Sequence, residues 1–155
     1  LQHREPGLVG AVSAFGLNAE IICDGIHIHP AVIELMFKAV PNQMILISDS
    51  INPTGLPDGE YVAGGLPITV KDHKAFLADG TLAGSTITLF DAVKNAIAFG
   101  VPEEIAILSA TLHPAKAVNL QEQVGSIGVG RKADLLLVDD AFELKKVYLR
   151  GNEID

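Results

Sequence analysis

The sequence predicts an α/β fold in which helices cover a parallel sheet, followed by a second, smaller sheet. The first observation is the order strand, helix, strand in residues 19–49, where both strands are continuous apolar runs, as in parallel sheets that are buried on both faces. The second is a series of strand-like segments after residue 125. Hydrophobic residues make up 48% of the 155 residues and charged residues 19%, which is the composition of a globular protein.

The first part of the chain contains the elements of the parallel sheet. A loop and a short helix are expected within residues 1–17. "AEIIC" predicts a buried strand that ends before Asp24-Gly25, and "QMILISD" predicts a second strand that ends at Asp49. Between them "PAVIELMFKAV" predicts a helix with Pro30 at its first position. Polar residues are few on this helix, so we expect it to be packed on most sides.

Residues 56–80 are expected to form an antiparallel hairpin inserted after the second strand. "EYVAGGLPITV" and "KAFLADG" alternate as strands do, and Gly64-Gly65 suits a hairpin turn. Three helices are expected next, in "GSTITLFDAVKNAIAFG", "VPEEIAILSATL" and "HPAKAVNL".

From Gly125 onward the pattern returns to strands and turns. "ADLLLVD" predicts a buried strand, Asp139-Asp140 a turn, and "LKKVYLRG" an alternating strand. This change places a domain boundary between residues 122 and 123.

Charge and cysteine content exclude several classes of function. The net charge is −8, which argues against a nucleic-acid surface and against binding to an anionic membrane. No apolar run approaches the roughly 18–20 residues of a membrane span. The single cysteine, Cys23, lies in an apolar run and is expected to be a small buried residue, which fits a reducing, cytoplasmic location. The chain opens on a polar, motif-like stretch without methionine, from which we expect a piece of a longer protein.

Polar residues that could carry chemistry follow both predicted strands. Asp49 could order a turn or act as a general base. His27 and His29 are spaced i,i+2, on one side of an extended strand. They could bind a metal, contact a substrate or be structural. Asp24 and Asp49 could complete a metal site, but no other His/Cys pair supports one.

Two further segments are candidates for binding an anion. Arg4, in "HREPG", could bind phosphate or carboxylate through its guanidinium group, or form a surface ion pair with Glu5. "LAGS" precedes a predicted helix, where backbone N–H groups favour an anion or a polar ligand. Alternatively, Ser85 is an N-cap.

Five motifs together resemble those of a known family. "HREPGLVGA", "DGIHIHP", "LISDSINPTGLPDG", "DGTLAGSTITL" and "TLHPAKAVNL" occur in this order in N-acetylglucosamine-6-phosphate deacetylases. The tail "GSIGVGRKADLLLVD" resembles the C-terminal signature of the amidohydrolase superfamily. The resemblance covers essentially the whole chain.

The resemblance implies a fold and a reaction. Residues 1–122 would be the last strands and helices of a distorted (β/α)8 barrel, and residues 123–155 would be C-terminal strands of a small β-sandwich domain. The reaction would be metal-dependent removal of acetate from N-acetylglucosamine 6-phosphate, giving glucosamine 6-phosphate.

The resemblance also implies roles for individual residues. Asp49 resembles the catalytic aspartate, which would activate a metal-bound water and then protonate the departing amine. Arg4 resembles the phosphate-binding arginine. A sugar-contacting segment of the family resembles Asp24, Gly25, Ile26 and His27. A loop that closes on the substrate resembles Leu82, Ala83, Gly84 and Ser85.

The family's metal ligands, a glutamate and two histidines, would lie before Leu1. The resemblance therefore implies a zinc or iron ion in the full-length enzyme and none bound by this chain alone, so His27 and His29 would not be ligands. We expect the isolated chain to be inactive, to expose apolar surface, and to form a homo-oligomer or pair with the missing N-terminal portion. Two alternatives are a non-catalytic sugar-phosphate-binding fragment and another amidohydrolase, such as a dihydroorotase or an adenine deaminase. "HREPG" followed by "DGIHIHP" argues against the second.

Overall fold

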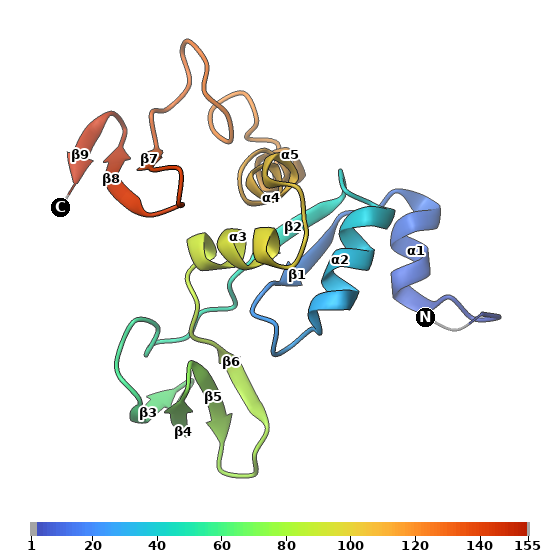
Figure 1. Ribbon diagram of the computed structural model, residues 1–155, viewed down its shortest axis with the longest axis vertical. Helices are drawn as coiled ribbons and strands as arrows, with labels where there is room; N and C mark the ends of the chain where they lie inside the picture. Colours follow the sequence, from blue (N-terminus) through green and yellow to red (C-terminus); the bar gives the residue numbers. More distant parts are fainter. Residues whose placement is uncertain (1–2, 155) are drawn as a thin grey trace. The chain divides into compact units, whose positions relative to one another are not determined.

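The computed structural model describes residues 3–154, and the chain divides into two compact units, Leu1–Ala110 and Thr111–Asp155. The division precedes the last helix, whereas the sequence placed a boundary after residue 122. Figure 1 shows the elements along the chain. The helices are α1 Gly7–Phe15, α2 Pro30–Ala39, α3 Leu89–Ala98, α4 Glu103–Ala110 and α5 Leu112–Ala117. The strands are β1 Ala19–Ile22, β2 Met44–Ile47, β3 Gly59–Ala63, β4 Leu66–Lys71, β5 Lys74–Leu77, β6 Leu82–Ser85, β7 Leu135–Val138, β8 Leu144–Leu149 and β9 Asn152–Ile154.

The first unit is built on a β1–α2–β2 motif, which confirms the predicted strand, helix and strand. β1 and β2 are parallel, in a register that pairs Ala19 with Met44 and Ile22 with Ile47. α3 and α4 both contact β2. The core is mostly aliphatic. Its buried side chains in these elements are Ile21, Ile33, Phe37, Met44, Ile45, Leu46, Ala92, Val93, Ala96 and Ala106.

Helix α2 begins as predicted but is less buried than predicted. Pro30 occupies its first turn, and His29 is its N-cap. Ile33 and Phe37 are the buried residues of this helix, while Val32 and Leu35 are about half exposed. The prediction that α2 is packed on most sides is therefore wrong for this chain. The described residues cover one face of the helix and leave an apolar face in contact with solvent.

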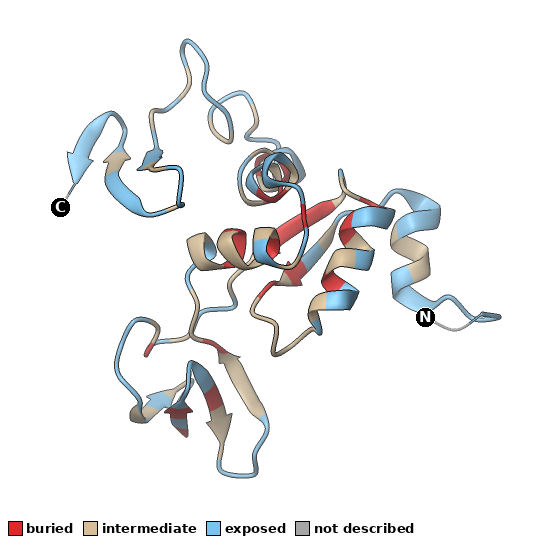
Figure 2. Cartoon of the chain, viewed as in Figure 1, coloured by how far each residue is buried: buried red, intermediate tan, exposed pale blue. Residues whose placement is uncertain are grey.

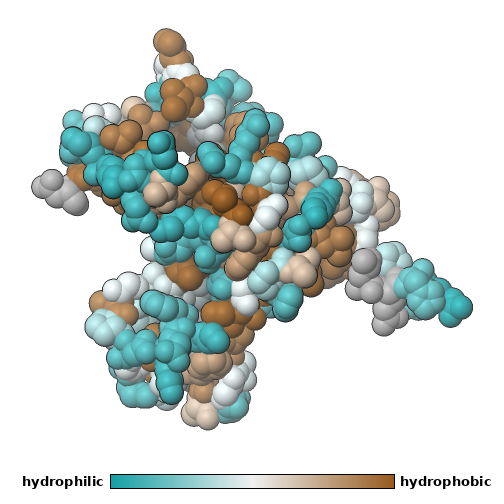
Figure 3. Space-filling model, viewed as in Figure 1, coloured by the Kyte–Doolittle hydropathy of each residue, from teal (hydrophilic) through white to brown (hydrophobic). Residues whose placement is uncertain are grey.

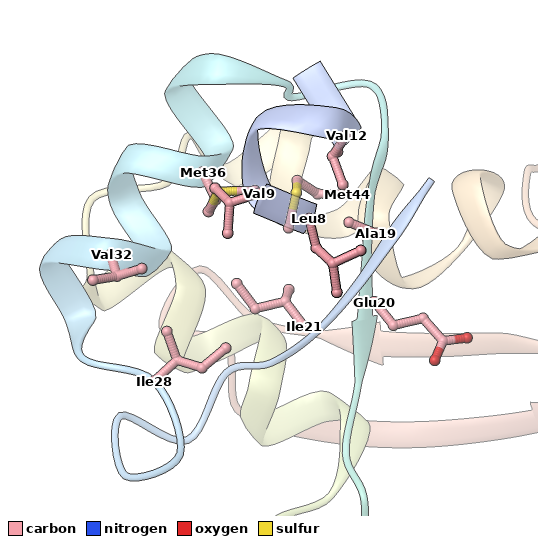
Figure 4. Close-up of a pocket in the computed structure, with 10 residues that line it drawn as sticks. All are labelled: Leu8, Val9, Val12, Ala19, Glu20, Ile21, Ile28, Val32, Met36 and Met44. Atoms are coloured by element: carbon pink, nitrogen blue, oxygen red, sulfur yellow. The ribbon is translucent and has the colours of Figure 1, made fainter. Parts of the chain in front are cut away.

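Helix α1 lies beside an apolar hollow. No residue of α1 is buried, and Leu8 is 87% exposed. The hollow has a volume of about 240 Å³, and Figure 4 shows side chains from α1, β1, α2 and β2 around it. None of the predicted site residues lines it. Its lining residues are Leu8, Val9, Val12, Ala19, Glu20, Ile21, Ile28, Val32, Met36 and Met44.

The segment after β2 forms a four-stranded antiparallel sheet in the order β3-β4-β5-β6. Gly64 and Gly65 link β3 to β4, both with positive φ (58° and 82°), as a two-residue hairpin turn requires. This confirms the predicted turn. Ile68, Val70 and Ala75 form a small core within the sheet.

The helix predicted to span residues 84–100 begins later than expected. "LAGS" is strand β6, and α3 begins at Leu89 with Thr88 as its N-cap. Thr88 and Asp91 form a capping box, in which each side chain accepts a hydrogen bond from the other's backbone N–H. The interpretation of Ser85 as an N-cap is therefore wrong, as is the placement of "LAGS" at a helix N-terminus.

The second unit contains α5 and a three-stranded antiparallel sheet in the order β7-β8-β9. The turn at Asp139-Asp140 is confirmed, because the Asp139 carboxylate accepts the backbone N–H groups of Ala141 and Glu143. The prediction that β7 is buried is wrong. Leu136 and Leu137 are about 50% exposed, and Figure 2 shows little buried surface in this sheet. Among the described residues of this unit, nothing covers the apolar strand.

Large apolar side chains are exposed in both units, and Figure 3 shows brown, apolar patches on the visible face. These side chains are exposed because no other described element packs over the helices and strands that carry them. Among residues 3–154 there is no helix with the length and apolar character that a bilayer crossing requires.

Candidate functional site

Two of the predicted polar clusters lie at the same edge of the parallel sheet. The last registered pair of β1 and β2 is Ile22 with Ile47, and Asp24 and Asp49 each follow that pair by two residues. The carboxyl ends of parallel strands are where α/β folds build binding sites. The structure thus places both acids at the edge that the sequence predicted.

Asp24 and His27 form a hydrogen-bonded pair. The Asp24 Oδ2 and His27 Nδ1 atoms lie 2.7 Å apart. The other carboxylate oxygen, Oδ1, accepts the backbone N–H groups of Ile26 and His27 at 2.8 and 2.9 Å. The Asp24 side chain is 2% exposed and that of His27 is 20% exposed. The carboxylate is therefore buried against the segment it orders, and the imidazole ring remains accessible.

These contacts shift the acidity of Asp24. Burial acts to raise its pKa, but the hydrogen bonds from His27 and from the two backbone N–H groups lower it by more. The pKa of Asp24 therefore lies below its ordinary value of 3.8, and the carboxyl group is ionised at neutral pH.

Two residues of helix α3 and its C-terminal end, Asn95 and Phe99, lie against the segment that carries Asp24. The Asn95 side-chain amide donates a hydrogen bond to the Cys23 carbonyl oxygen at 2.9 Å. Gly25 has a φ of 73°, and a Cβ at this position would lie 3.0 Å from Cζ of Phe99. No local pattern pointed to Asn95, because its partner is 72 residues away.

Cys23 is fully buried, as predicted. Burial, followed by the charge of Asp24, raises the pKa of its thiol to about 12. The thiol is therefore protonated and unreactive at neutral pH.

His29 has a structural role. It is exposed, and its Nδ1 accepts the backbone N–H of Ala31 at 3.2 Å, which caps α2. Residues 24–28 bend and do not continue β1, so the i,i+2 spacing does not place His27 and His29 on one strand. Within residues 3–154 no group of three or more His, Cys, Asp or Glu side chains could hold a metal ion.

Asp49 is exposed, and its backbone is in the left-handed region, with a φ of 51°. Non-glycine residues seldom adopt this region, although aspartate tolerates it better than most. The backbone carbonyl of Asp49 accepts the N–H of Ser85 at 2.9 Å. In the part of the chain that the structure describes, no hydrogen bond to the Asp49 carboxylate is present. Its backbone is thus fixed while its carboxylate faces solvent.

Strand β6 lies directly against Asp49. A Cβ on Gly84 would lie 2.7 Å from Cγ2 of Ile51 and 3.2 Å from the Asp49 carbonyl oxygen. The N–H of Ile51 and the hydroxyl of Thr54 donate to the Ser85 carbonyl. The structure therefore brings "LAGS" and Asp49 together, and the close approach explains a glycine at position 84.

Arg4 precedes helix α1 in the chain. It is exposed, and in the described part of the chain it forms no hydrogen bond or ion pair, so the alternative of an ion pair with Glu5 is not observed. Its guanidinium group is free to meet an anion.

Comparison with known proteins identifies similar sequences and structures. The amidohydrolase family matches residues 9–154. The chain is 39% identical to the N-acetylglucosamine-6-phosphate deacetylase of Vibrio furnissii, over 97% of this chain and 38% of that protein. It is 34% identical to a putative N-acetylgalactosamine-6-phosphate deacetylase of Escherichia coli K12, over 97% of this chain and 92% of that protein.

A solved structure is similar over nearly the whole chain. It is a substituted N-acetyl-D-glucosamine-6-phosphate deacetylase from Mycobacterium smegmatis in complex with N-acetyl-D-glucosamine 6-phosphate, with a TM-score of 0.89 and 31% identity. The match covers 98% of this chain and 42% of that one. The chain thus spans about two fifths of the length of the Vibrio and Mycobacterium proteins.

Proposed function

The chain belongs to the amidohydrolase family, and we propose that it provides the C-terminal part of the active site of an N-acetylglucosamine-6-phosphate deacetylase. The observation that carries this proposal is the position of Asp49. Its carboxylate accepts no hydrogen bond from residues 3–154, its backbone is held by β6, and it stands at the sheet edge that also carries His27. This is the geometry expected of a general base that must reach a substrate without rearranging.

In the proposed amide hydrolysis, Asp49 carries out two proton transfers. A water oxygen attacks the acetamide carbonyl carbon, and Asp49 accepts the proton that this water loses. Asp49 then returns the proton to the amide nitrogen as the carbon–nitrogen bond breaks. The products are the free amine and acetic acid, which releases its remaining proton to the solvent and becomes acetate. The two transfers together leave Asp49 as it began, so one carboxylate serves as base and then as acid.

The remaining residues are proposed to bind the substrate. The segment Asp24–His27 contacts the sugar, and Arg4 binds the 6-phosphate through its guanidinium fork. Leu82–Ser85 close on the substrate from the side of Asp49. The accessibility of the His27 ring and the absence of an ion-pair partner for Arg4 among residues 3–154 support these roles.

A zinc or iron ion is proposed for the complete enzyme, since amidohydrolases are generally metal-dependent. The described residues do not fit such a site, because no three of their possible ligands lie together. The ligands would therefore come from outside residues 3–154, and no step of the proposed reaction is assigned to a metal.

The elements of this chain are proposed to belong to two domains of the complete enzyme. We propose that β1 and β2 with their helices are the last part of a (β/α)8 barrel, and that β7–β9 belong to a small β-sandwich domain. The apolar surface left open on both units supports pairing with an N-terminal portion or with a second copy. The single, buried, protonated cysteine supports a cytoplasmic location.

A fusion protein tests the catalytic proposal. Residues 1–155 would replace the matched C-terminal portion of the Vibrio furnissii deacetylase, and acetate release from N-acetylglucosamine 6-phosphate would be measured. We expect turnover from the fusion. Asp49→Asn should lower kcat by roughly a thousandfold or more, because asparagine cannot accept the proton from the attacking water. Substrate binding should be largely retained.

Three outcomes would count against the proposal. One is a fusion that folds and binds metal but releases no acetate. A second is an Asp49→Asn variant that loses binding and rate equally. The third is stoichiometric metal with turnover in the 155-residue chain alone, which would refute the placement of the metal ligands outside this chain.

The Escherichia coli relative favours a second candidate substrate, N-acetylgalactosamine 6-phosphate. The two sugars differ at one hydroxyl group, so the proposed chemistry at the acetamide is the same for both. The ratio of kcat/KM for the two sugar phosphates in the fusion decides between them.

A further inference from the structure

The geometry points to Asp24 as a positioning residue, which fixes the ring proton of His27 on Nδ1 and presents Nε2 to the substrate. The identity of the substrate rests on the proposed function. The position of the ring proton does not, and it can be measured in this chain alone.

The carboxylate determines where the proton lies. An ionised carboxylate can accept hydrogen bonds but cannot donate them, and the pKa of Asp24 is lowered by its contacts. Its Oδ2 lies 2.7 Å from Nδ1 of His27. The hydrogen in that contact must therefore belong to Nδ1.

The opposite ring nitrogen is the one left for a ligand. Nε2 of His27 has no hydrogen-bond partner in the portion of the chain described, and the ring is 20% exposed. In the neutral ring Nε2 is an acceptor, since Nδ1 holds the proton. A hydroxyl group of a sugar is the class of donor that this atom would recognise.

The support around Asp24 keeps the ring in one orientation. Oδ1 of Asp24 binds the N–H groups of Ile26 and His27, so the carboxylate cannot rotate freely. Asn95 ties the preceding carbonyl, that of Cys23, to α3. The ring is thus preorganised before a ligand arrives, which reduces the entropy lost on binding.

Nitrogen NMR of the ¹⁵N-labelled 155-residue chain tests the proton position without any substitution. Long-range proton–nitrogen correlations distinguish a protonated ring nitrogen from a bare one, and the His27 signals are assigned by their loss in His27→Gln. We expect a protonated Nδ1 and a bare Nε2 at a pH where the ring is neutral. The reverse arrangement in the wild-type chain would overturn the inference.

Asp24→Asn then reverses the arrangement. The side-chain oxygen of the introduced asparagine can still accept the backbone N–H groups, but its amide nitrogen can donate to the ring and cannot accept from it, so the proton should move to Nε2. Asp79→Asn is the matched control. Asp79 also accepts a backbone N–H two residues ahead, is exposed, and should leave the His27 signals unchanged. An Asp24→Asn variant that folds and keeps Nδ1 protonated would contradict the inference.

The functional consequence is measured in the Vibrio fusion. Asp24→Asn should lower kcat/KM roughly tenfold to a hundredfold, as expected for a lost hydrogen bond at a charged group. The double variant with His27→Gln should be no worse than His27→Gln alone, because both substitutions remove one function. Additive losses, or unchanged kcat/KM despite a reversed ring proton, would refute the positioning role. A fusion that folds and binds metal but has no activity would refute the proposed function, while the ring proton in the chain would still be measured.

Discussion

At the scale of single residues, the candidate site depends on hydrogen bonds within one turn and on the close approach of two distant segments. Asp24 orders its own turn and fixes His27, and Gly84 allows β6 to approach Asp49. His29, which stands beside the site in sequence, caps a helix. Residue type and spacing predicted this segment as a candidate site, and hydrogen bonds divide its residues into structural and accessible ones.

Gly84→Ala should destabilise the chain more than Gly80→Ala. Both glycines have a φ near 85–89°, so the backbone strain added by a Cβ is matched. The Cβ at 84 meets Ile51 and Asp49, whereas at 80 nothing lies within 4 Å. We expect an additional loss of about 1–3 kcal/mol in the free energy of unfolding for Gly84→Ala, from overpacking. Urea unfolding of both variants checks this, and equal losses would contradict the close approach.

Asp24 should make stability depend on acid pH. Because its pKa is lowered on folding, the unfolded chain binds this proton more readily than the folded chain. The stabilisation is therefore present above the unfolded value, near 3.8, and is lost as pH falls below it. The difference in unfolding free energy between wild type and Asp24→Asn should shrink between about pH 6 and about pH 3. A difference that does not change with pH would show that Asp24 contributes no such linkage.

At the scale of elements, local sequence signals located the ends of some helices and missed others. Pro30 marks the start of α2. The pattern "GSTIT" predicts an earlier start for α3 than the structure has, because the capping box is formed by Thr88 and not by Ser85. The N–H and C=O of Ser85 bond to Asp49 and Ile51, and that pairing keeps residues 82–85 extended. A single bridge between the distant residues Ser50 and Ser85 thus overrode a helical pattern.

Thr88→Ala should lower the free energy of unfolding by about 1 kcal/mol, the usual effect of losing an N-cap. The hydroxyl accepts the N–H of Asp91 at 3.1 Å, and alanine offers no acceptor. Thr88→Ser keeps the hydroxyl and should retain most of the stability. Chemical denaturation followed by circular dichroism compares the three proteins. If the serine and alanine variants are equally destabilised, the cap is not the cause.

At the scale of the whole molecule, apolar side chains on α1, α2 and β7 remain exposed, with no covering layer among residues 3–154. Leu8 and Phe15 on α1 are 87% and 77% exposed, and a two-stranded parallel sheet is small for independent stability. Patches of this kind commonly mark interfaces.

The isolated chain should therefore self-associate, and sedimentation velocity at micromolar concentration measures this. Phe15→Glu should reduce association, because it places a charge on the exposed face of α1. Asn42→Glu adds the same charge at an exposed polar position and should have little effect. A stable, monodisperse wild-type monomer would contradict the expectation.

The sequence by itself determined the order strand, helix, strand in residues 19–49, the sheet edge at which Asp24 and Asp49 lie, and the choice of Asp49 and His27 as candidates. These follow from local periodicity and from residue chemistry within a few positions of each other. The tertiary structure alone decided that Gly84 and Ser85 meet Asp49, that Asn95 supports Cys23, and that β7 is exposed. Each of these depends on contacts between distant segments, or on the absence of a covering layer among the described residues. Burial and long-range pairing are properties of the assembled layers, so no local pattern encodes them.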